Sequence, residues 1–144
     1  MSLHQKYMRL ALNEALLAYE QNEVPVGAVV VCKGRVIARG HNLTETLNDV
    51  TAHAEMQAIT AAASTLGGKY LQECSLYVTL EPCLMCAGAI AWSQLGELIY
   101  ACPDEKKGYS LQAPGALHPK TKVISGILSD ESAQLLRDFF QNKR

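Results

Sequence analysis

Apolar positions near the N-terminus recur at the spacing of an α-helix. Residues three, four or seven positions apart share one side of a helix, and apolar residues at this spacing form a buried stripe. The pattern therefore predicts a helix over about Ser2–Gln21, with a stripe that belongs to the core rather than to a cofactor surface. The residues of the stripe are Met8, Ala11, Leu12, Ala15, Leu16 and Tyr19.

A continuous apolar run after this helix indicates the first strand. Ala28–Val31 is apolar throughout, Lys33-Gly34 is typical of a turn, and Val36–Ala38 is apolar again. Two such runs joined by a short turn predict a β-hairpin. Because the first strand has no polar position, we expect it to be covered on both faces of its sheet.

The remainder of the chain alternates between strand and helix patterns. After a polar loop over Gly40–Val50, the pattern predicts a helix capped by Thr51 and ended by Gly67-Gly68, and then a strand at Leu76–Leu80. A helix at Cys83–Ser93, with Pro82 in its first turn, and a strand at Leu98–Ala101 are expected next. The last predicted elements are an irregular segment at Lys106–Pro119, a strand at Val123–Ile124 and a helix capped by Ser129. The alternation predicts one α/β domain over residues 1–144. It is expected to be a three-layer α/β/α sandwich with helices on both faces of a mixed five-stranded sheet.

Composition narrows the class of protein without defining it. A chain of 144 residues with 49% apolar and 19% charged residues can fill one core. The net charge of −1 means that binding of a nucleic acid would depend on a local basic patch. We expect neither a signal peptide nor a membrane span, because no apolar run is long enough. The five cysteines, an odd number, favour a reducing compartment and predict a cytoplasmic location.

Two segments, Thr51–Glu55 and Glu81–Cys86, contain residue types that bind metals. Cys83 and Cys86 are three positions apart and so share one face of a helical turn. The unpaired backbone N–H groups at a helix N-terminus favour thiolate over thiol. A redox pair is the alternative, but the flanking residues are not those of a thioredoxin-like motif. Two thiolates on one face are half of a tetrahedral zinc site.

His53 supplies a third ligand and leaves the fourth position of a Zn²⁺ ion to water or hydroxide. Three protein ligands and one open position are typical of a catalytic zinc, and we expect one ion per subunit. Glu55 is better placed to accept a proton and pass it to a leaving amine than to bind the metal. A structural zinc would need a fourth protein donor, and the candidates lack ligand spacing to the pair. Those candidates are His41, Cys74 and Cys102.

The two motifs together resemble the H-x-E…P-C-x-x-C signature of the zinc-dependent cytidine and deoxycytidylate deaminases. Asn22–Ala28, Thr51–Glu55 and Leu76–Ile90 are similar to the bacterial tRNA-specific adenosine deaminases, and the resemblance covers nearly the whole chain. It implies a cytidine-deaminase-like fold and a hydrolase that acts on C–N bonds of cyclic amidines. The implied reaction converts the wobble adenosine of a tRNA anticodon to inosine and releases ammonia.

The resemblance also implies partners and substrate-binding residues. It implies a homodimer in which the tRNA anticodon stem-loop contacts both subunits. Asn42 would hydrogen-bond the flipped nucleotide, Val26 would pack on the base, and the backbone of Ala54 would meet its edge. The further substrate-binding residues are Glu81, which would act through its backbone, Asp104, Lys106, Phe140 and Arg144.

Two other functions stay open at this point. One is deamination of a free base or nucleoside, with guanine or cytosine (or cytidine) as the substrate. The other is a non-catalytic, zinc-stabilised subunit that binds RNA or a protein partner, which the presence of Glu55 disfavours. The chain departs from the usual tRNA deaminase residues at Val50, Gln94 and His118-Pro119, positions that concern tRNA contacts and lie outside the zinc motifs.

Overall fold

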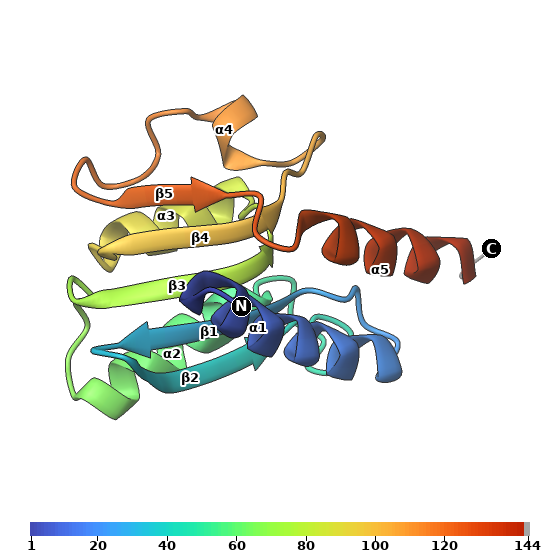
Figure 1. Cartoon of the computed structure of the whole chain (residues 1–144), viewed down its shortest axis with the longest axis horizontal. Coiled ribbons are helices and arrows are strands. Elements are labelled where there is room, and N and C mark those ends of the chain that lie inside the picture. The colour runs from blue at the N-terminus through green and yellow to red at the C-terminus, as the bar shows by residue number, and fades with distance from the viewer. Residues whose placement is uncertain (143–144) are drawn as a thin grey trace.

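Five strands form one mixed sheet at the centre of the fold, in the order β2-β1-β3-β4-β5 (Figure 1). The structure is a computed structural model that describes residues 1–142, so Lys143 and the predicted substrate residue Arg144 lie outside the described residues. The elements are α1 Leu3–Glu20, β1 Gly27–Cys32, β2 Arg35–His41, α2 Ala54–Leu66, β3 Cys74–Leu80, α3 Leu84–Trp92, β4 Glu97–Cys102, α4 Tyr109–Gln112, β5 Lys122–Ser125 and α5 Ser129–Asn142. β1 runs antiparallel to β2 and β3, whereas β3, β4 and β5 are parallel.

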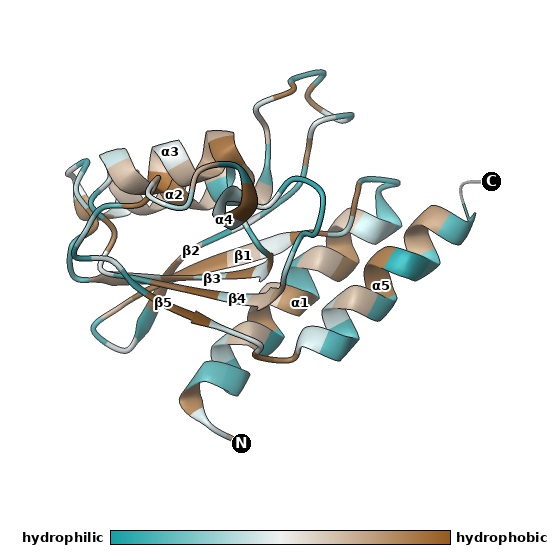
Figure 2. Cartoon of the chain, turned by 90° about the horizontal axis from the view of Figure 1, so that it is seen from above, coloured by the Kyte–Doolittle hydropathy of each residue, from teal (hydrophilic) through white to brown (hydrophobic). Residues whose placement is uncertain are grey.

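Helices cover both faces of this sheet, as the alternating pattern predicted. Figure 2 shows α2, α3 and α4 on one side and α1 and α5 on the other. Alternate residues of β1 point to opposite faces of the sheet. Ala28 and Val30 pack in the core under α2 and α3, and Val29 and Val31 pack in the core under α1. The α/β/α sandwich is therefore confirmed. Within the described residues, none of the helices has both the length and the hydropathy needed to cross a membrane.

The hairpin places the first helix against the sheet. Lys33 and Gly34 at its turn have φ values of 52° and 77°, a left-handed pair that matches the twist of the flanking strands. At the start of β1, a side chain at Gly27 would overlap the backbone of Ala11 and Ala15 in α1. Only glycine permits this close approach, which brings the helix directly onto the strand.

Three predicted helix starts differ from the structure. Thr51 does not cap α2, because its hydroxyl and backbone N–H both donate to the carboxylate of Asp49 at 2.8 Å, and His53 is the N-cap. Pro82 precedes the N-cap of α3 instead of lying in its first turn. Ser129 is the first helical residue of α5. In addition, the segment predicted to be irregular contains α4.

Candidate active site

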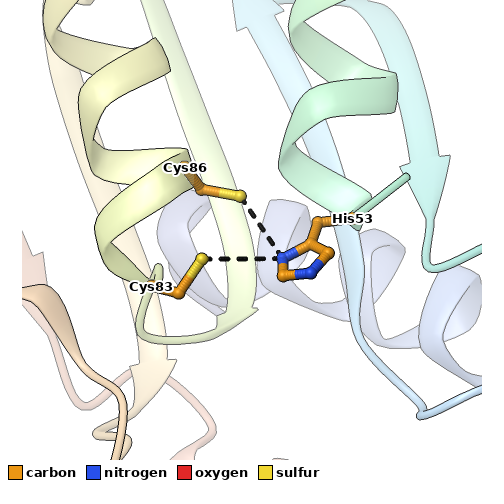
Figure 3. A group of neighbouring side chains, drawn as sticks. All are labelled: His53, Cys83 and Cys86. Atoms are coloured by element: carbon orange, nitrogen blue, oxygen red, sulfur yellow. Dashed lines mark hydrogen bonds between the residues drawn. The ribbon is translucent and has the colours of Figure 1, made fainter. Parts of the chain in front are cut away.

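Two helix N-termini bring the predicted metal ligands together. His53 is the N-cap of α2 and Cys83 is the N-cap of α3, and both have extended backbone conformations. Neither side chain makes a capping hydrogen bond, although capping is the usual role of a polar residue at this position. Both side chains are therefore available for another partner, and Figure 3 shows them directed toward each other.

The spacing of the three side chains fits a tetrahedral metal ion. Nδ1 of His53 lies 3.6 Å from Sγ of Cys83 and 3.5 Å from Sγ of Cys86 (Figure 3). Zinc bonds of about 2.3 Å to sulfur and about 2.0 Å to nitrogen, at tetrahedral angles, separate these atoms by about 3.5 Å. All three ligand atoms lie within 4.8 Å of one another. The donor set and its geometry thus fit Zn²⁺, and we call His53, Cys83 and Cys86 the metal centre.

The other candidate donors are engaged elsewhere. His41 contacts Glu14 and Gln21 through its two ring nitrogens. Cys102 hydrogen-bonds the carbonyl of Thr79 and the hydroxyl of Ser132. Cys74 pairs across the sheet with Cys32. Among residues 1–142, the metal centre is the one group of three His, Cys, Asp or Glu side chains with ligand geometry. A site with three protein ligands leaves one position open, which is typical of a catalytic zinc.

The environment of the two thiols favours a thiolate. The hydrogen bond from Cys86, helped by His53, lowers the pKa of Cys83 to about 4. The same contact, together with burial, raises the pKa of Cys86. One negative charge is therefore shared by the pair even without a cation, and the positive end of the α3 dipole faces it. A divalent cation would stabilise the second thiolate as well.

Glu55 lies in the first turn of α2 and is almost fully buried. Burial raises its pKa to about 7, and its carboxyl group also interacts with Sγ of Cys86. A carboxyl group whose pKa is near neutrality can both accept and release a proton at physiological pH. Glu55 lies next to the metal centre and is not one of the three side chains with ligand geometry.

A cavity of about 410 Å³ opens beside the metal centre. It brings together most of the predicted site residues, because β1 begins, and β2 and β3 end, next to the N-termini of α2 and α3. The lining residues are Val24, Val26, Asn42, Thr44, His53, Ala54, Glu55, Leu80, Glu81, Cys83, Asp104 and Lys107. Two predicted substrate residues are not among them: Lys106, and Phe140, which is 54% exposed on α5.

Sequence reasoning missed four lining residues: Val24, Thr44, Leu80 and Lys107. A signal for Leu80 was available, because residues two apart in a strand share a face, and Leu76 and Val78 belong to the core under α2 and α3. No comparable signal distinguishes Lys107 from Lys106. The turn that begins at Asp104, whose Oδ1 accepts both backbone N–H groups, determines which lysine reaches the cavity.

The side chains of Asn42 and Glu81 differ in how strongly their polar atoms are engaged within the protein. Oδ1 of Asn42 accepts the N–H of Thr44 at 3.3 Å, and its amide donates to the carbonyl of Val24 at 3.4 Å. These bonds are long, and they orient the amide within the cavity wall. The carboxylate of Glu81, by contrast, is fully engaged by the segment Asp104–Ser110. The predicted backbone role of Glu81 stays a prediction.

Comparison with known proteins agrees with this site. Residues 1–102 match the zinc-binding region of cytidine and deoxycytidylate deaminases. The tRNA-specific adenosine deaminase of Agrobacterium fabrum is 48% identical over 143 residues, covering 96% of this chain and 94% of that protein.

Solved structures agree as well. One, from work on A-to-I editing by tRNA:A34 deaminases at the wobble position, has a TM-score of 0.85 and 47% identity over 91% of this chain and 99% of its own. A guanine deaminase from Bacillus subtilis has a TM-score of 0.68 and 36% identity, and the match covers 81% of this chain and 72% of that one. The cytidine-deaminase-like fold predicted from the motifs is thereby confirmed, and the chain belongs to the zinc-dependent cytidine and deoxycytidylate deaminase family and, within it, to the tRNA-specific adenosine deaminases.

Proposed function

We propose that this chain hydrolytically deaminates the wobble adenosine of a tRNA anticodon to inosine and releases ammonia. The observation that carries the proposal is the buried Glu55 carboxyl group beside the metal centre, in the wall of a cavity that also contains Asn42. The family of the chain supports hydrolysis of an exocyclic amine. The activities named for its relatives support adenosine in tRNA as the substrate.

His53, Cys83 and Cys86 would hold one Zn²⁺ ion per subunit, with water or hydroxide as the fourth ligand. When bound, the ion supplies Lewis acidity that lowers the pKa of that water to near neutrality. The three residues that would hold it come from the N-terminal ends of two helices that pack into the core, and His53 and Cys83 line the cavity.

Glu55 performs the proton transfers in this proposal. Its carboxylate accepts one proton from the attacking water and delivers it to the ring nitrogen. It then accepts the second proton from the hydroxyl group added to the base and delivers it to the departing amine. The raised pKa matches both tasks, because a group that titrates near 7 gives up a proton about as readily as it takes one. The enclosed position also keeps bulk water from exchanging that proton.

The cavity would accept a single unstacked nucleotide. A base within a stacked loop cannot reach the metal centre, so the adenosine must flip out to enter. Val26 would pack on the base, the Ala54 backbone would meet its edge, and Asn42 would hydrogen-bond the nucleotide. Asp104, with Lys106 and Lys107, would contact the phosphates or sugars around it. The roles of Glu81, Phe140 and Arg144 remain part of the same prediction.

A homodimer is part of the proposal, and the outer face of α3 supports it. Leu84, Gly88 and Trp92 lie four residues apart and so share one side of the helix. Trp92 is 85% exposed, Leu84 is also exposed, and the space around Gly88 is open. An apolar side chain of this size is costly to leave in water. A second subunit on this face would cover it, and the tRNA would contact both copies.

The proposal also places the protein in the cytoplasm, where tRNA is available. All five cysteines are free, which suits a reducing compartment.

Incubation of the purified protein with transcribed tRNA, followed by sequencing, tests the substrate directly. Conversion of the wobble adenosine alone, with free guanine and cytidine left intact, is the expected result. Release of ammonia from guanine, without inosine in tRNA, would replace this proposal with the activity named for the Bacillus subtilis structure.

A further inference from the structure

Two buried carboxylates outside the metal centre hold the loops that border the cavity. Glu23 is 0% exposed and Glu81 is 3% exposed. Neither is a metal ligand, and neither pairs with a cationic side chain among the residues described. A buried carboxylate is costly unless hydrogen bonds compensate for the water that it has lost. Each of the two finds those bonds in a single loop.

Glu23 binds the loop that follows β2. Its Oε1 accepts the N–H of Glu45 at 3.1 Å, and its Oε2 accepts both the N–H and the hydroxyl of Thr46, at 2.6 and 2.7 Å. The hydroxyl of Thr44 adds a longer contact of 3.5 Å. Glu23 follows Asn22, whose φ of 61° turns the chain at the end of α1. We call residues 42–46 the first rim loop.

Glu81 binds the loop that follows β4 in a matching way. Its Oε1 accepts the N–H of Asp104 at 3.1 Å, and its Oε2 accepts the N–H and the hydroxyl of Ser110, at 3.1 and 2.6 Å. Gly108 lies so close to this carboxylate that any side chain there would overlap it. We call residues 104–110 the second rim loop. Each carboxylate thus accepts two backbone N–H groups from its loop, together with one hydroxyl group at Glu81 and two at Glu23.

The two loops contribute different walls of the cavity. The first supplies Asn42 and Thr44, and the second supplies Asp104 and Lys107. They follow β2 and β4, which are separated in the sheet by β1 and β3. The loop held by Glu23 also fixes Asn42, because the N–H of Thr44 donates to Oδ1 of Asn42. Loosening either loop would therefore move one wall of the cavity. The N–H of Tyr109 also donates to the carbonyl of Pro82 at 3.0 Å, a bond that ties the second loop to the start of α3 without involving the Glu81 carboxylate.

We propose that Glu23 and Glu81 are positioning residues that hold the two rim loops at the separation required to bind one flipped nucleotide. The inference rests on the proposed function for the identity of that nucleotide. The anchoring itself depends only on the hydrogen bonds of the two carboxylates. Glutamine at either position keeps the size of the side chain but replaces one acceptor oxygen with an N–H₂ group, which opposes the backbone N–H donors of the loop.

The test compares Glu23→Gln and Glu81→Gln with the wild-type protein, each loaded with zinc. Hydrogen exchange followed by mass spectrometry should accelerate in the first rim loop alone for Glu23→Gln and in the second alone for Glu81→Gln. We expect KM for an anticodon stem-loop to rise about tenfold in each, the loss typical of a hydrogen bond to a charged group. Zinc content should be unchanged, and kcat should stay within about twofold, because the metal centre and Glu55 are not displaced.

Smaller substitutions keep the test decisive if a glutamine variant fails to fold. Thr46→Val and Ser110→Ala each remove one hydroxyl donor and leave the carboxylates intact, so they should give weaker effects confined to the same loops. Glu73→Gln, the same substitution at an exposed carboxylate, is the matched control and should behave as wild type.

Unchanged exchange in both rim loops would overturn the proposal. A fall in kcat or in zinc content with KM unaltered would overturn it as well, because the two residues would then act on the metal centre. If the wild-type protein forms no inosine in tRNA, the proposed function fails separately. Hydrogen exchange in the two rim loops of the glutamine variants then still tests whether Glu23 and Glu81 anchor these loops.

Discussion

The metal centre and the rim of the cavity are built in different ways. His53 and Cys83 begin α2 and α3, helices that pack into the main core through Ala58 and Ile90. Of the two rim loops, Tyr109 belongs to that core, and hydrogen bonds to Glu23 and Glu81 hold the polar residues of both loops. The chemistry is therefore tied to the stability of the fold, whereas substrate fit depends on polar contacts that can change without unfolding. Substitutions in the two regions should therefore affect zinc content, turnover and substrate affinity differently.

Cys86→Ser should have the largest effect, because it damages the metal centre and the core together. Sγ of Cys86 is buried, and serine is a poor zinc ligand. We expect loss of bound zinc, loss of detectable inosine formation and a fall in Tm of at least about 5 °C. Metal analysis and thermal unfolding measure these. The half-buried Cys32 provides a matched Cys→Ser control outside the metal centre. A Cys86→Ser protein with full zinc content would refute the ligand assignment.

Glu55→Gln should remove activity and spare the metal centre. The amide keeps the shape of the side chain but cannot carry a proton, so kcat should fall by about 10²- to 10⁴-fold. Because burial of the charged form opposes folding, the neutral amide should leave Tm equal to or above that of the wild type. Single-turnover inosine formation and zinc analysis on one preparation provide the readout. Near-normal turnover in this variant would show that another group moves the protons.

Asn42→Ala tests the rim directly. Removal of the amide takes away its contacts with Val24 and Thr44 and the proposed bond to the nucleotide. The expected loss is about tenfold in kcat/KM, mostly through KM, at unchanged zinc content. Asn13, exposed on α1, is the control for an Asn→Ala substitution. An effect on kcat alone would place Asn42 with the metal centre instead of with the rim.

The smallest expected effect is a change in acid stability for Glu23→Gln. Burial opposes ionisation of Glu23, but hydrogen bonds from Thr46, Glu45 and Thr44 outweigh it and lower its pKa. A lowered pKa in the folded state stabilises the protein fully above about pH 4.3, the unfolded value, and this contribution is lost as the pH falls toward the folded value. The stability difference between wild type and variant should therefore shrink below that pH. Urea unfolding at several pH values measures it, and a constant difference would rule out the assigned ionisation.

The same contrast explains what could be predicted from the sequence. The helices, the hairpin and the metal centre follow local rules: periodic apolar positions, a turn pair, and cysteines at helical spacing. The starts of α2 and α3 did not follow the usual capping rule, because the cap positions are occupied by His53 and Cys83, whose side chains face the metal site.

The rim could be predicted only in part. Asn42 and Asp104 were found through resemblance, but the anchoring roles of Glu23 and Glu81 depend on contacts between residues more than 20 positions apart. No local pattern marks a carboxylate that will accept three or four hydrogen bonds from a distant loop. Lys107 was missed for a similar reason, since a turn at Asp104 selects it over its neighbour.

Sequencing of tRNA after incubation with the zinc-loaded protein measures the proposed reaction itself. Wild-type protein should convert the wobble adenosine to inosine and leave the other adenosines of the same tRNA unchanged, and Glu55→Gln should convert none in the same time. Equal conversion by both proteins would contradict the assigned role of Glu55, and no conversion by the wild type on tRNAs with a wobble adenosine would contradict the proposed function.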